Sequence, residues 1–200
     1  CILMAKRIFD IVVSLTSLFL LSPLFLIVAL WIRSDSEGPA FFHQTRIGKQ
    51  GQTFQFWKFR TMDIDAEKHK PALRKLNKMQ CGILFKMEND PRVTRAGRFL
   101  RKSSLDELPQ LWNILKGDMS LVGPRPPLPD EVAKYTPYQR QRLEVTPGLT
   151  CIWQISGRSE IPFEKQVEMD LEYIANKSFW YDLVILLKTI PAVWKKTGAY

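Results

Sequence analysis

The chain has 200 residues, of which 46% are hydrophobic and 24% charged, and its formal net charge is +9. Such a charge indicates an anionic partner, which leaves nucleic acid, acidic lipid head groups and phosphorylated substrates as candidates. The three cysteines are odd in number and widely spaced, with no CxxC motif or Cys/His cluster. Neither a disulfide framework nor a zinc site is therefore indicated.

The first element is an apolar stretch, residues 8–32, whose part from Ile11 to Ile32 contains no ionisable side chain. That part is long enough for a transmembrane helix. Ser22-Pro23 lies near its middle, and a proline removes a backbone N–H and clashes with the preceding turn, so we expect a break there. Each limb is then roughly 18 Å long, well short of a hydrocarbon core that is about 30 Å thick.

The flanking charges favour a bent path through the bilayer. Lys6 and Arg7 precede the apolar stretch and Arg33 follows it, and cytoplasmic flanks are the ones enriched in Lys and Arg. A helix–break–helix that returns to its starting face satisfies both flanks, and the Ser22 hydroxyl can bond a carbonyl that the proline frees. On these residues alone, an ordinary kinked span remains the alternative.

The aromatic segment Gln52–Met62 predicts a strand or a short interfacial segment. In a strand, Lys58 and Arg60 would point to one face, because side chains alternate along it. The polar residues 63–80 predict a surface helix, and residues 81–91 predict a loop.

A row of arginines follows this loop. Its members recur every three residues, which would place their guanidiniums along one side of a helix: Arg92, Arg95, Arg98 and Arg101. A solvated face is the simple interpretation of such a run. Beside a membrane segment we favour contact with head groups or phosphates, since each cation near an anionic leaflet contributes about 1 kcal/mol.

Ser104–Lys116 has the clearest amphipathic pattern, and Gly117 is well placed to end that helix. The proline-rich run Gly123–Pro127 predicts a stiff, extended loop that holds Arg125. The elements expected after it are a loop at 147–150, a short strand at Ile152–Ile155, a helix from Phe163 to Ala175 and a helix at Phe179–Trp194. The last one is too short to span a bilayer, and its aromatic residues predict a position in the membrane interface.

Asp106 and Glu107 are the candidates for chemistry. The simple structural interpretation is a capping box, with Ser104 as N-cap and Glu107 at the third helical position. Cationic residues nearby weigh against it, because such a set could bind a diphosphate. Among cations we expect Asp106 to keep a depressed pKa and to stay ionised, as a carboxylate nucleophile must. Two adjacent carboxylates can also hold Mg²⁺.

Several runs resemble the bacterial monotopic phosphoglycosyl transferases, in family order and over essentially the whole chain. They are Lys58–Met62, Ser104–Asn113, Lys116–Pro126, Pro147–Thr150 and Trp153–Arg158. Ser22-Pro23 falls where this family breaks its re-entrant helix. One departure is Cys151, which stands where the family pattern has glycine, and it leaves the shape of that loop open. The chain looks like the C-terminal catalytic part of the family's larger members.

The resemblance implies a reaction: transfer of a sugar 1-phosphate from a UDP-sugar to undecaprenyl phosphate, with release of UMP. Asp106 would be the nucleophile that forms a phosphosugar–enzyme intermediate. Glu107 would be its dyad partner and would help to hold Mg²⁺, the implied cofactor. The residues that would contact phosphates are Lys58, Arg60, Arg101, Arg125 and Arg158.

The predicted fold class is α+β: a mostly helical monotopic membrane protein with short strands and interfacial amphipathic helices. Residues 1–33 would form the re-entrant membrane helix, and residues 34–200 a catalytic domain on the cytoplasmic face of the bacterial inner membrane. The implied role is the first membrane step of polysaccharide, O-antigen or capsule assembly. The sequence leaves open which sugar is transferred and whether the chain forms a homo-oligomer.

Two other classes of protein share parts of this pattern. A non-catalytic basic adaptor that binds anionic membrane lipids would fit the composition, the charge and the membrane segment, but it has no need of adjacent carboxylates beside a rigid-loop arginine. Nucleic-acid binding gains support from the charge alone, since no groove-reading motif is present. We therefore expect no nucleic-acid partner.

Overall fold

The computed structural model describes residues 2–66, 68, 83, 87, 90–157 and 160–195. The surface helix predicted at 63–80 and the loop at 81–91 fall largely outside the described residues. The described part is mostly helical, with two small two-stranded sheets, which is consistent with the predicted α+β class.

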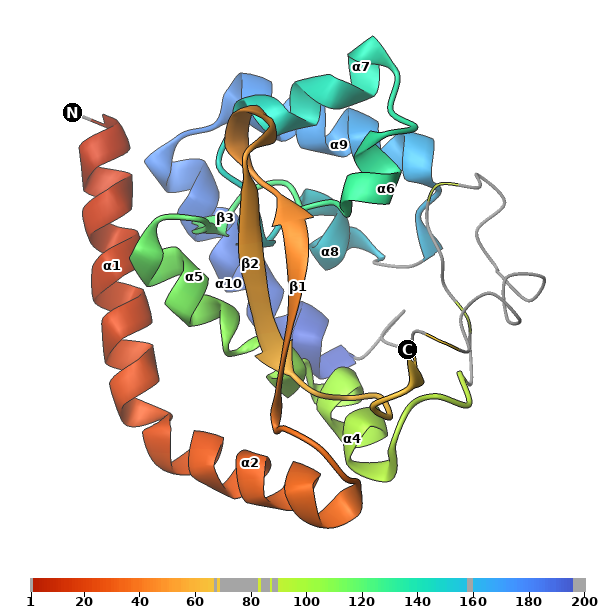
Figure 1. Ribbon diagram of the computed structural model, residues 1–200. Coiled ribbons are helices and arrows are strands. Elements are labelled where there is room, and N and C mark those ends of the chain that lie inside the picture. Colours follow the sequence, from red (N-terminus) through yellow and green to blue (C-terminus); the bar gives the residue numbers. More distant parts are fainter. Residues whose placement is uncertain are drawn as a thin grey trace.

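Two helices at the N-terminus form a bent pair. α1 (Ile2–Leu20) and α2 (Ser22–Asp35) meet at an angle of 61°, so that α2 turns beneath the body of the protein (Figure 1). Pro23 lies in the first turn of α2, and the Ser22 hydroxyl donates a hydrogen bond to the Phe19 carbonyl at 2.8 Å. The predicted break and its serine contact are therefore confirmed. Among the described residues no single helix is long and apolar enough to cross a membrane, and only this bent pair has the length and composition to do so.

The other elements follow in chain order. A hairpin of β1 (Phe41–Ile47) and β2 (Thr53–Phe59) is antiparallel, with η1 (Lys49–Gly51) at its tip. The central elements are α4 (Arg95–Ser103), η3 (Leu105–Glu107), α5 (Gln110–Lys116) and β3 (Ser120–Val122). The remaining ones are α6 (Pro129–Val132), α7 (Pro137–Arg140), η4 (Gln141–Glu144), β4 (Gly148–Thr150), α8 (Ile152–Ser156), α9 (Phe163–Asn176) and α10 (Phe179–Lys195).

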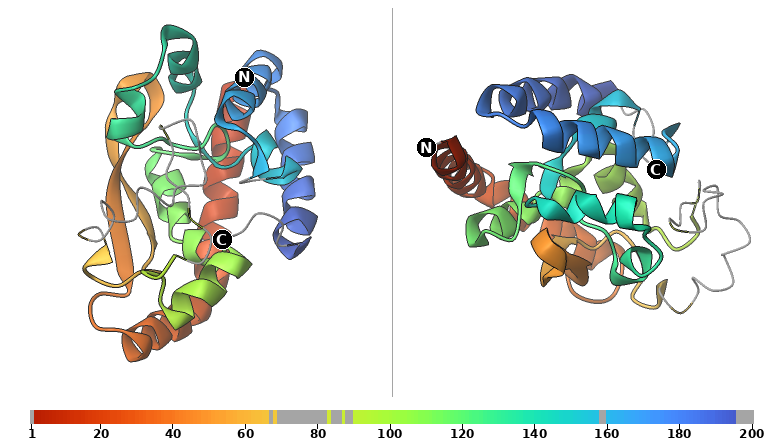
Figure 2. Two further views of the ribbon diagram at one scale, coloured as in Figure 1. Left: turned by 90° about the vertical axis from the view of Figure 1, so that its right-hand side faces the viewer. Right: turned by 90° about the horizontal axis from the view of Figure 1, so that it is seen from above.

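These elements form layers. The hairpin is one outer layer, α5 and α1 lie behind it, and α9 and α10 form the opposite side (Figure 2). The main core fills the space between them, with Phe56, Ile114, Val122 and Ile185 among its buried residues. Asn113, fully buried, joins two layers, because its side chain donates to the Gln55 carbonyl and accepts from the Trp57 N–H.

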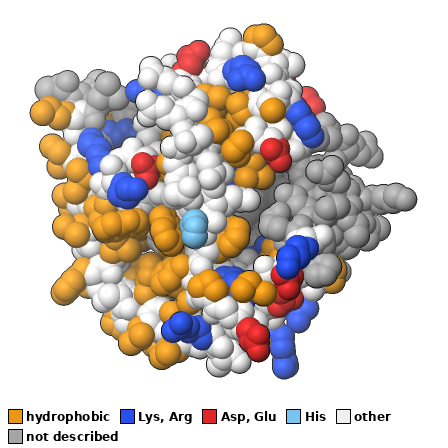
Figure 3. Space-filling model, in the orientation of Figure 1, with side chains coloured by type: hydrophobic (Ala, Val, Ile, Leu, Met, Phe, Trp, Pro, Cys, Tyr) orange, Lys and Arg blue, Asp and Glu red, His pale blue; other side chains and the backbone are white. Residues whose placement is uncertain are grey.

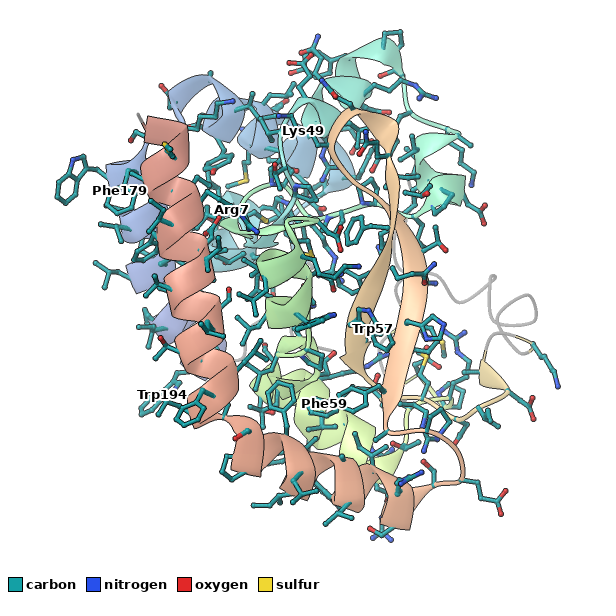
Figure 4. The ribbon with its side chains drawn as sticks, turned by 60° about the vertical axis from the view of Figure 1, so that its left-hand side comes forward. Arg7, Lys49, Trp57, Phe59, Phe179 and Trp194 are labelled. Atoms are coloured by element: carbon teal, nitrogen blue, oxygen red, sulfur yellow. The ribbon has the colours of Figure 1, made fainter. Side chains whose placement is uncertain are left out.

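The start of the bent pair is fastened to this body. Lys6 forms an ion pair with Asp182 of α10 and donates to the Val122 carbonyl and the Tyr173 hydroxyl, both at 3.0 Å. Arg7 donates two hydrogen bonds to carbonyls at the C-terminal end of α5, and Figure 4 shows it pointing from α1 toward that helix. The two basic residues that precede the apolar stretch therefore hold α1 against the domain.

The end of the bent pair is fastened to the same body. Arg60 is buried and donates to the carbonyls of Ser36, Glu37 and Pro39, at 2.9, 2.7 and 2.7 Å. Asp35, the last residue of α2, accepts a hydrogen bond from the first turn of α4. Both ends of the apolar stretch are thus bonded to one folded domain.

The amphipathic helix predicted at Ser104–Lys116 is two elements instead of one. Ser104 adopts a left-handed conformation (φ 57°) as it ends α4, and its side chain makes no capping hydrogen bond, so the alternative interpretation of this segment as a capping box is excluded. A 3₁₀ turn, η3, follows before α5 begins at Gln110. Gly117 (φ 97°) ends α5 as predicted. Trp112 of α5 is 53% exposed, although it is a large apolar side chain in this amphipathic segment.

The short strand predicted at Ile152–Ile155 is also wrong, because this segment is helix α8. The strand lies just before it, at β4, which pairs in parallel with β3. Gly123 and Gly148 allow this pairing, since a Cβ on either one would clash with the backbone of the other segment. Cys151, the residue that departs from the family pattern, is buried in extended backbone (φ −151°), which any residue can adopt. The substitution therefore leaves the loop unstrained.

The arginine row does not share one helix face. Arg92 precedes α4 and forms a buried ion pair with Asp90. Arg95 and Arg98 are exposed on α4, whereas Arg101 turns inward and donates to the Thr61 hydroxyl at 3.0 Å. The row is split because the helix begins only at Arg95, after Thr94 has capped it.

Candidate active site

A cavity of about 640 Å³ opens between the hairpin, η3, the loop after β3, and α8 to α10. Its lining is rich in charge. The charged residues on its wall are Arg46, Lys58, Asp90, Arg92, Arg101, Asp106, Glu107, Arg125, Glu131 and Arg142. Cations outnumber carboxylates in this set, so the cavity suits an anionic ligand.

Asp106 and Glu107 enter the cavity from the 3₁₀ turn η3. The turn places them there because α4 ends at Ser104 and α5 begins only after Pro109, so the dyad lies at a corner between two helices. Asp106 is 8% exposed. Glu107 accepts a hydrogen bond from Arg125 Nη1 at 3.1 Å, which links the dyad to the proline-rich loop.

Burial sets the ionisation of the dyad. Burial first, and then the charge of Glu107, raise the pKa of Asp106 to about 6, against the opposing attraction of nearby cations. The expected depressed pKa is therefore wrong in direction: the sequence indicated the cations but not the burial. At pH 7 the carboxylate is still ionised by about ten to one. Burial likewise lowers the pKa of Lys58 to about 8, although Asp106 favours its charged form.

Three of the predicted phosphate contacts meet at the dyad: Lys58, Arg101 and Arg125. Lys58 extends from β2, with its ammonium 5.4 Å from the centre of the Phe42 ring. Arg101 comes from the last turn of α4. Arg125 is held in the extended loop between prolines that the sequence predicts.

Two predicted contacts are not part of this group. Arg60 lies outside the cavity and bonds the loop after α2. The sequence predicted that Lys58 and Arg60 point to the same face of a strand. Strand β2 ends at Phe59, so the alternation of side chains along the strand does not extend to Arg60. Arg158 lies outside the described residues.

Two further arginines on the cavity wall, Arg46 and Arg142, were not among the predicted site residues. The hairpin register could have found Arg46, because this residue pairs with Phe54 on the same face as Lys58. Arg142 forms a buried ion pair with Asp170 and lies over the rings of Tyr135 and Phe163. No local pattern marks that contact, since the partners are distant in sequence.

The dyad offers two carboxylates to a divalent cation. Among the described residues no group of three His, Cys, Asp or Glu side chains could hold a metal. Two carboxylates nevertheless face one cavity, and Mg²⁺ typically takes one or two carboxylates together with substrate phosphates. Burial is the main cause of the raised pKa of Asp106, and repulsion by Glu107 is the second cause; a bound cation would relieve that repulsion.

An exposed apolar surface runs along α1 and α2 (Figure 3), and exposed apolar side chains of α10 extend it. We call it the apolar belt. Its most exposed large side chains include Ile8, Val12, Leu15, Phe19, Leu20, Leu26, Ile27, Leu30, Trp180, Leu187, Ile190 and Trp194. Phe179 and Trp194 mark the two ends of α10, which runs alongside α1 (Figure 4). A surface of this extent indicates a membrane or protein interaction site.

Comparison with known proteins matches residues 2–196 to the family described as Bacterial sugar transferase. The chain is 48% identical to a protein of Streptococcus agalactiae named Galactosyl transferase CpsE. It is 43% identical to a Salmonella typhimurium protein named Undecaprenyl-phosphate galactose phosphotransferase, and 44% identical to Exopolysaccharide production protein ExoY of Rhizobium meliloti. Each alignment covers 98% of this chain, but 44%, 41% and 88% of the respective relatives. The chain thus spans less than half the length of the first two.

Proposed function

Because the chain belongs to the bacterial sugar transferase family, it is a transferase, and we propose that it moves a sugar 1-phosphate from a UDP-sugar to undecaprenyl phosphate, releasing UMP. The observation that carries this proposal is Asp106: a carboxylate buried beside Glu107 in a cavity lined by an excess of cations. The Salmonella relative supports the proposal, because its name includes undecaprenyl phosphate as the lipid and galactose as the sugar.

The reaction proceeds in two displacements at one phosphorus. First, an Asp106 carboxylate oxygen attacks the phosphorus that bears the sugar, and the bond to the bridging oxygen breaks, so that its electron pair leaves on UMP. Second, an oxygen of the lipid phosphate attacks the same phosphorus, and the bond to Asp106 breaks, which regenerates the carboxylate. Two steps allow a soluble donor and a lipid acceptor to use one site in turn.

The neighbouring residues stabilise charge during both steps. Lys58, Arg101 and Arg125 surround the dyad and favour the charge that spreads over the transferring oxygens. Arg125 is positioned by its hydrogen bond to Glu107. Asp106 and Glu107 would hold Mg²⁺, which would supply further neutralisation of phosphate charge.

The membrane is the proposed setting, with the bent pair as a re-entrant anchor. Support comes from Lys6 and Arg60, which bond the two ends of the pair to the same domain. A chain tied in this way would enter the bilayer and return on one face, which we propose to be the cytoplasmic face of a bacterial inner membrane. The apolar belt would then lie in the lipid.

The position of α10 supports a lipid acceptor. One side of this helix lines the cavity through Leu186, Thr189 and Val193, and the other side bears exposed residues of the apolar belt such as Leu187 and Trp194. A single helix therefore separates the cavity from the proposed membrane surface. The phosphate of a lipid held there would need to move little to reach the dyad.

The decisive experiment is mass spectrometry of enzyme incubated with a UDP-sugar and Mg²⁺ but no acceptor. We expect a phosphosugar adduct on the peptide that carries Asp106, with one UMP released per adduct, and loss of both on chelation by EDTA. A panel of UDP-sugars in the same assay would identify the donor. Product formation with the adduct absent, or on another residue, would contradict the mechanism. Undiminished rates in EDTA would exclude the metal.

A non-catalytic membrane adaptor accounts for the apolar belt but gives no role to a buried carboxylate dyad. Binding to anionic vesicles without any adduct or UMP release would favour it. The re-entrant path has its own test, since cysteines introduced before Lys6 and after Arg33 should label from the same face. Labelling from opposite faces would mean a true span.

A further inference from the structure

Arg46 is a cavity-lining cation to which the proposed reaction has so far given no task. It lies on β1, on the face that carries Phe56 and Lys58, and its guanidinium lies 5.2 Å from the Phe56 ring centre. Its Nη1 donates a hydrogen bond to the Pro126 carbonyl at 3.0 Å. Its Nε is buried without a hydrogen-bond partner.

The charge of Arg46 is also poorly compensated. A guanidinium carries five N–H donors, and a buried one is normally paired with carboxylates or other acceptors. Burial and the neighbouring charge of Arg125 lower the pKa of Arg46 to about 10, and the attraction of Glu131 and Glu107 offsets only part of this. Glu131 is itself engaged with the Leu128 N–H. An anion between the two arginines would satisfy both.

The arrangement of the charged residues in the cavity indicates which anion would bind at Arg46. The hairpin register places Arg46 opposite Phe54 and Lys58 opposite Phe42, so on their shared face Arg46 lies farther toward the hairpin tip. Arg46 bonds the Pro126 carbonyl, and the adjacent Arg125 bonds Glu107, so a line of contacts runs from the dyad through Arg125 to Arg46. With the sugar-bearing phosphorus at Asp106, the next phosphate of a nucleoside diphosphate would extend toward Arg46.

We propose that Arg46 and Arg125 form a phosphate subsite that the leaving nucleotide and the incoming lipid phosphate occupy in turn. The inference rests on the proposed function. Attacking and leaving oxygens lie roughly in line at a transferring phosphorus. In the first step the subsite therefore holds the UMP phosphate opposite Asp106. In the second step the lipid phosphate must approach opposite the Asp106–phosphorus bond, which is the place that UMP has vacated.

The test measures the two half-reactions separately in Arg46→Ala. Adduct formation is followed with UDP-sugar and no acceptor, and adduct discharge is followed after undecaprenyl phosphate is added to isolated adduct. We expect both rates to fall about 100-fold, the effect of losing one charge-stabilising donor. Guanidinium ion at millimolar concentration should restore both rates at least tenfold, because it fits the vacated volume and carries the charge.

Urea is the matched probe for a purely structural role. It is planar and donates hydrogen bonds to a carbonyl as guanidinium does, but it is neutral, so it could replace the bond to Pro126 without binding phosphate. The matched control variant is Arg140→Ala, whose guanidinium also bonds a carbonyl, that of Val132, but lies outside the cavity. It should change neither rate and respond to neither additive.

Three results would overturn the inference: wild-type rates in Arg46→Ala, equal rescue by urea and guanidinium, or slow formation with normal discharge. If Arg46→Ala does not fold, Arg46→Lys is used to test the inference. Lysine keeps the positive charge but cannot make the two parallel hydrogen bonds of a guanidinium. Both rates should then fall about tenfold, and unchanged rates would overturn the inference. Failure of the wild-type enzyme to form any adduct would instead contradict the proposed function.

Discussion

Two clusters of buried charge in this protein differ in how completely they are satisfied. In the cluster around Lys6, the ammonium donates to Asp182, Tyr173 and the Val122 carbonyl, and the second oxygen of Asp182 accepts from Tyr173. All three ammonium donors are used. Such a cluster holds α1 against the domain, and it leaves no ammonium donor of Lys6 free to bind a ligand.

The cavity around Asp106 is the opposite case. Glu107 is bonded to Arg125, but the pKa values of Asp106 and Lys58 are both displaced toward their neutral forms by burial. Arg46 has a buried nitrogen without a partner. The difference teaches that a satisfied cluster serves the architecture, whereas an unsatisfied one in a cavity is prepared for an anionic ligand.

The largest expected effect comes from Asp106→Asn, which removes the proposed nucleophile but keeps the shape of the side chain. Adduct formation and turnover should fall at least a thousandfold, while the matched variant Asp118→Asn, outside the cavity, should stay active.

The same Asp106→Asn variant should be more stable than the wild type at pH 7. The folded pKa of Asp106 is raised from 3.8 to about 6, so stability is lost as pH rises through that window and the full cost is present at pH 7.

Neutralising the residue should recover about 3 kcal/mol at pH 7. Thermal unfolding at pH 7 and at pH 4 measures this gain, which should shrink at the lower pH. A variant that is less stable than the wild type at pH 7 would contradict the idea that the carboxylate is held in an unfavourable environment.

The second effect is a bell-shaped dependence of adduct formation on pH. Below pH 6 the rate should fall about tenfold per unit, because Asp106 (pKa about 6) takes up a proton. Above pH 8 it should fall again as Lys58 (pKa about 8) loses its charge. Single-turnover rates between pH 4.5 and 9.5 test both limbs. Lys58→Arg should remove the fall of the rate above pH 8. If the rate of this variant still falls above pH 8, a group other than Lys58 causes that fall.

The third prediction concerns a variant that disrupts the cluster around Lys6. Asp182→Asn leaves Lys6 without its carboxylate and should cost about 2 kcal/mol of stability, at the lower end for a buried pair because Lys6 is 24% exposed. Activity per folded molecule should stay within about threefold. The double variant Lys6→Met/Asp182→Leu should recover most of the loss, and a double-mutant cycle measures it. A selective loss of activity without loss of stability would show that this cluster also serves the reaction.

The smallest effect concerns Ser22, which belongs to neither cluster. Ser22→Ala removes the hydrogen bond to the Phe19 carbonyl and should cost about 1 kcal/mol. Thermal unfolding in detergent measures the loss, with Ser34→Ala as a control, since its hydroxyl bonds the Trp31 carbonyl in the same way without a neighbouring proline. Equal effects of the two variants would mean that the break has no special need of its serine.

Local signals predicted several elements correctly, and each has a local cause. The break at Pro23 follows from a missing N–H, and the end of α5 at Gly117 follows from a left-handed residue. The helices near Phe163–Ala175 and Phe179–Trp194 were found because their apolar residues recur at helical spacing. By contrast, the capping box at Ser104 failed, because the chain there ends one helix before it starts the next.

By itself, the sequence determined the family, the break in the apolar stretch, and the dyad with three of its cations, because these are carried by contiguous runs of residues. The tertiary structure alone decided that Arg60 serves the fold while Arg46 faces the cavity, and that the pKa of Asp106 is raised. Those outcomes depend on strand ends, register and burial, which arise only when segments distant in the chain pack together.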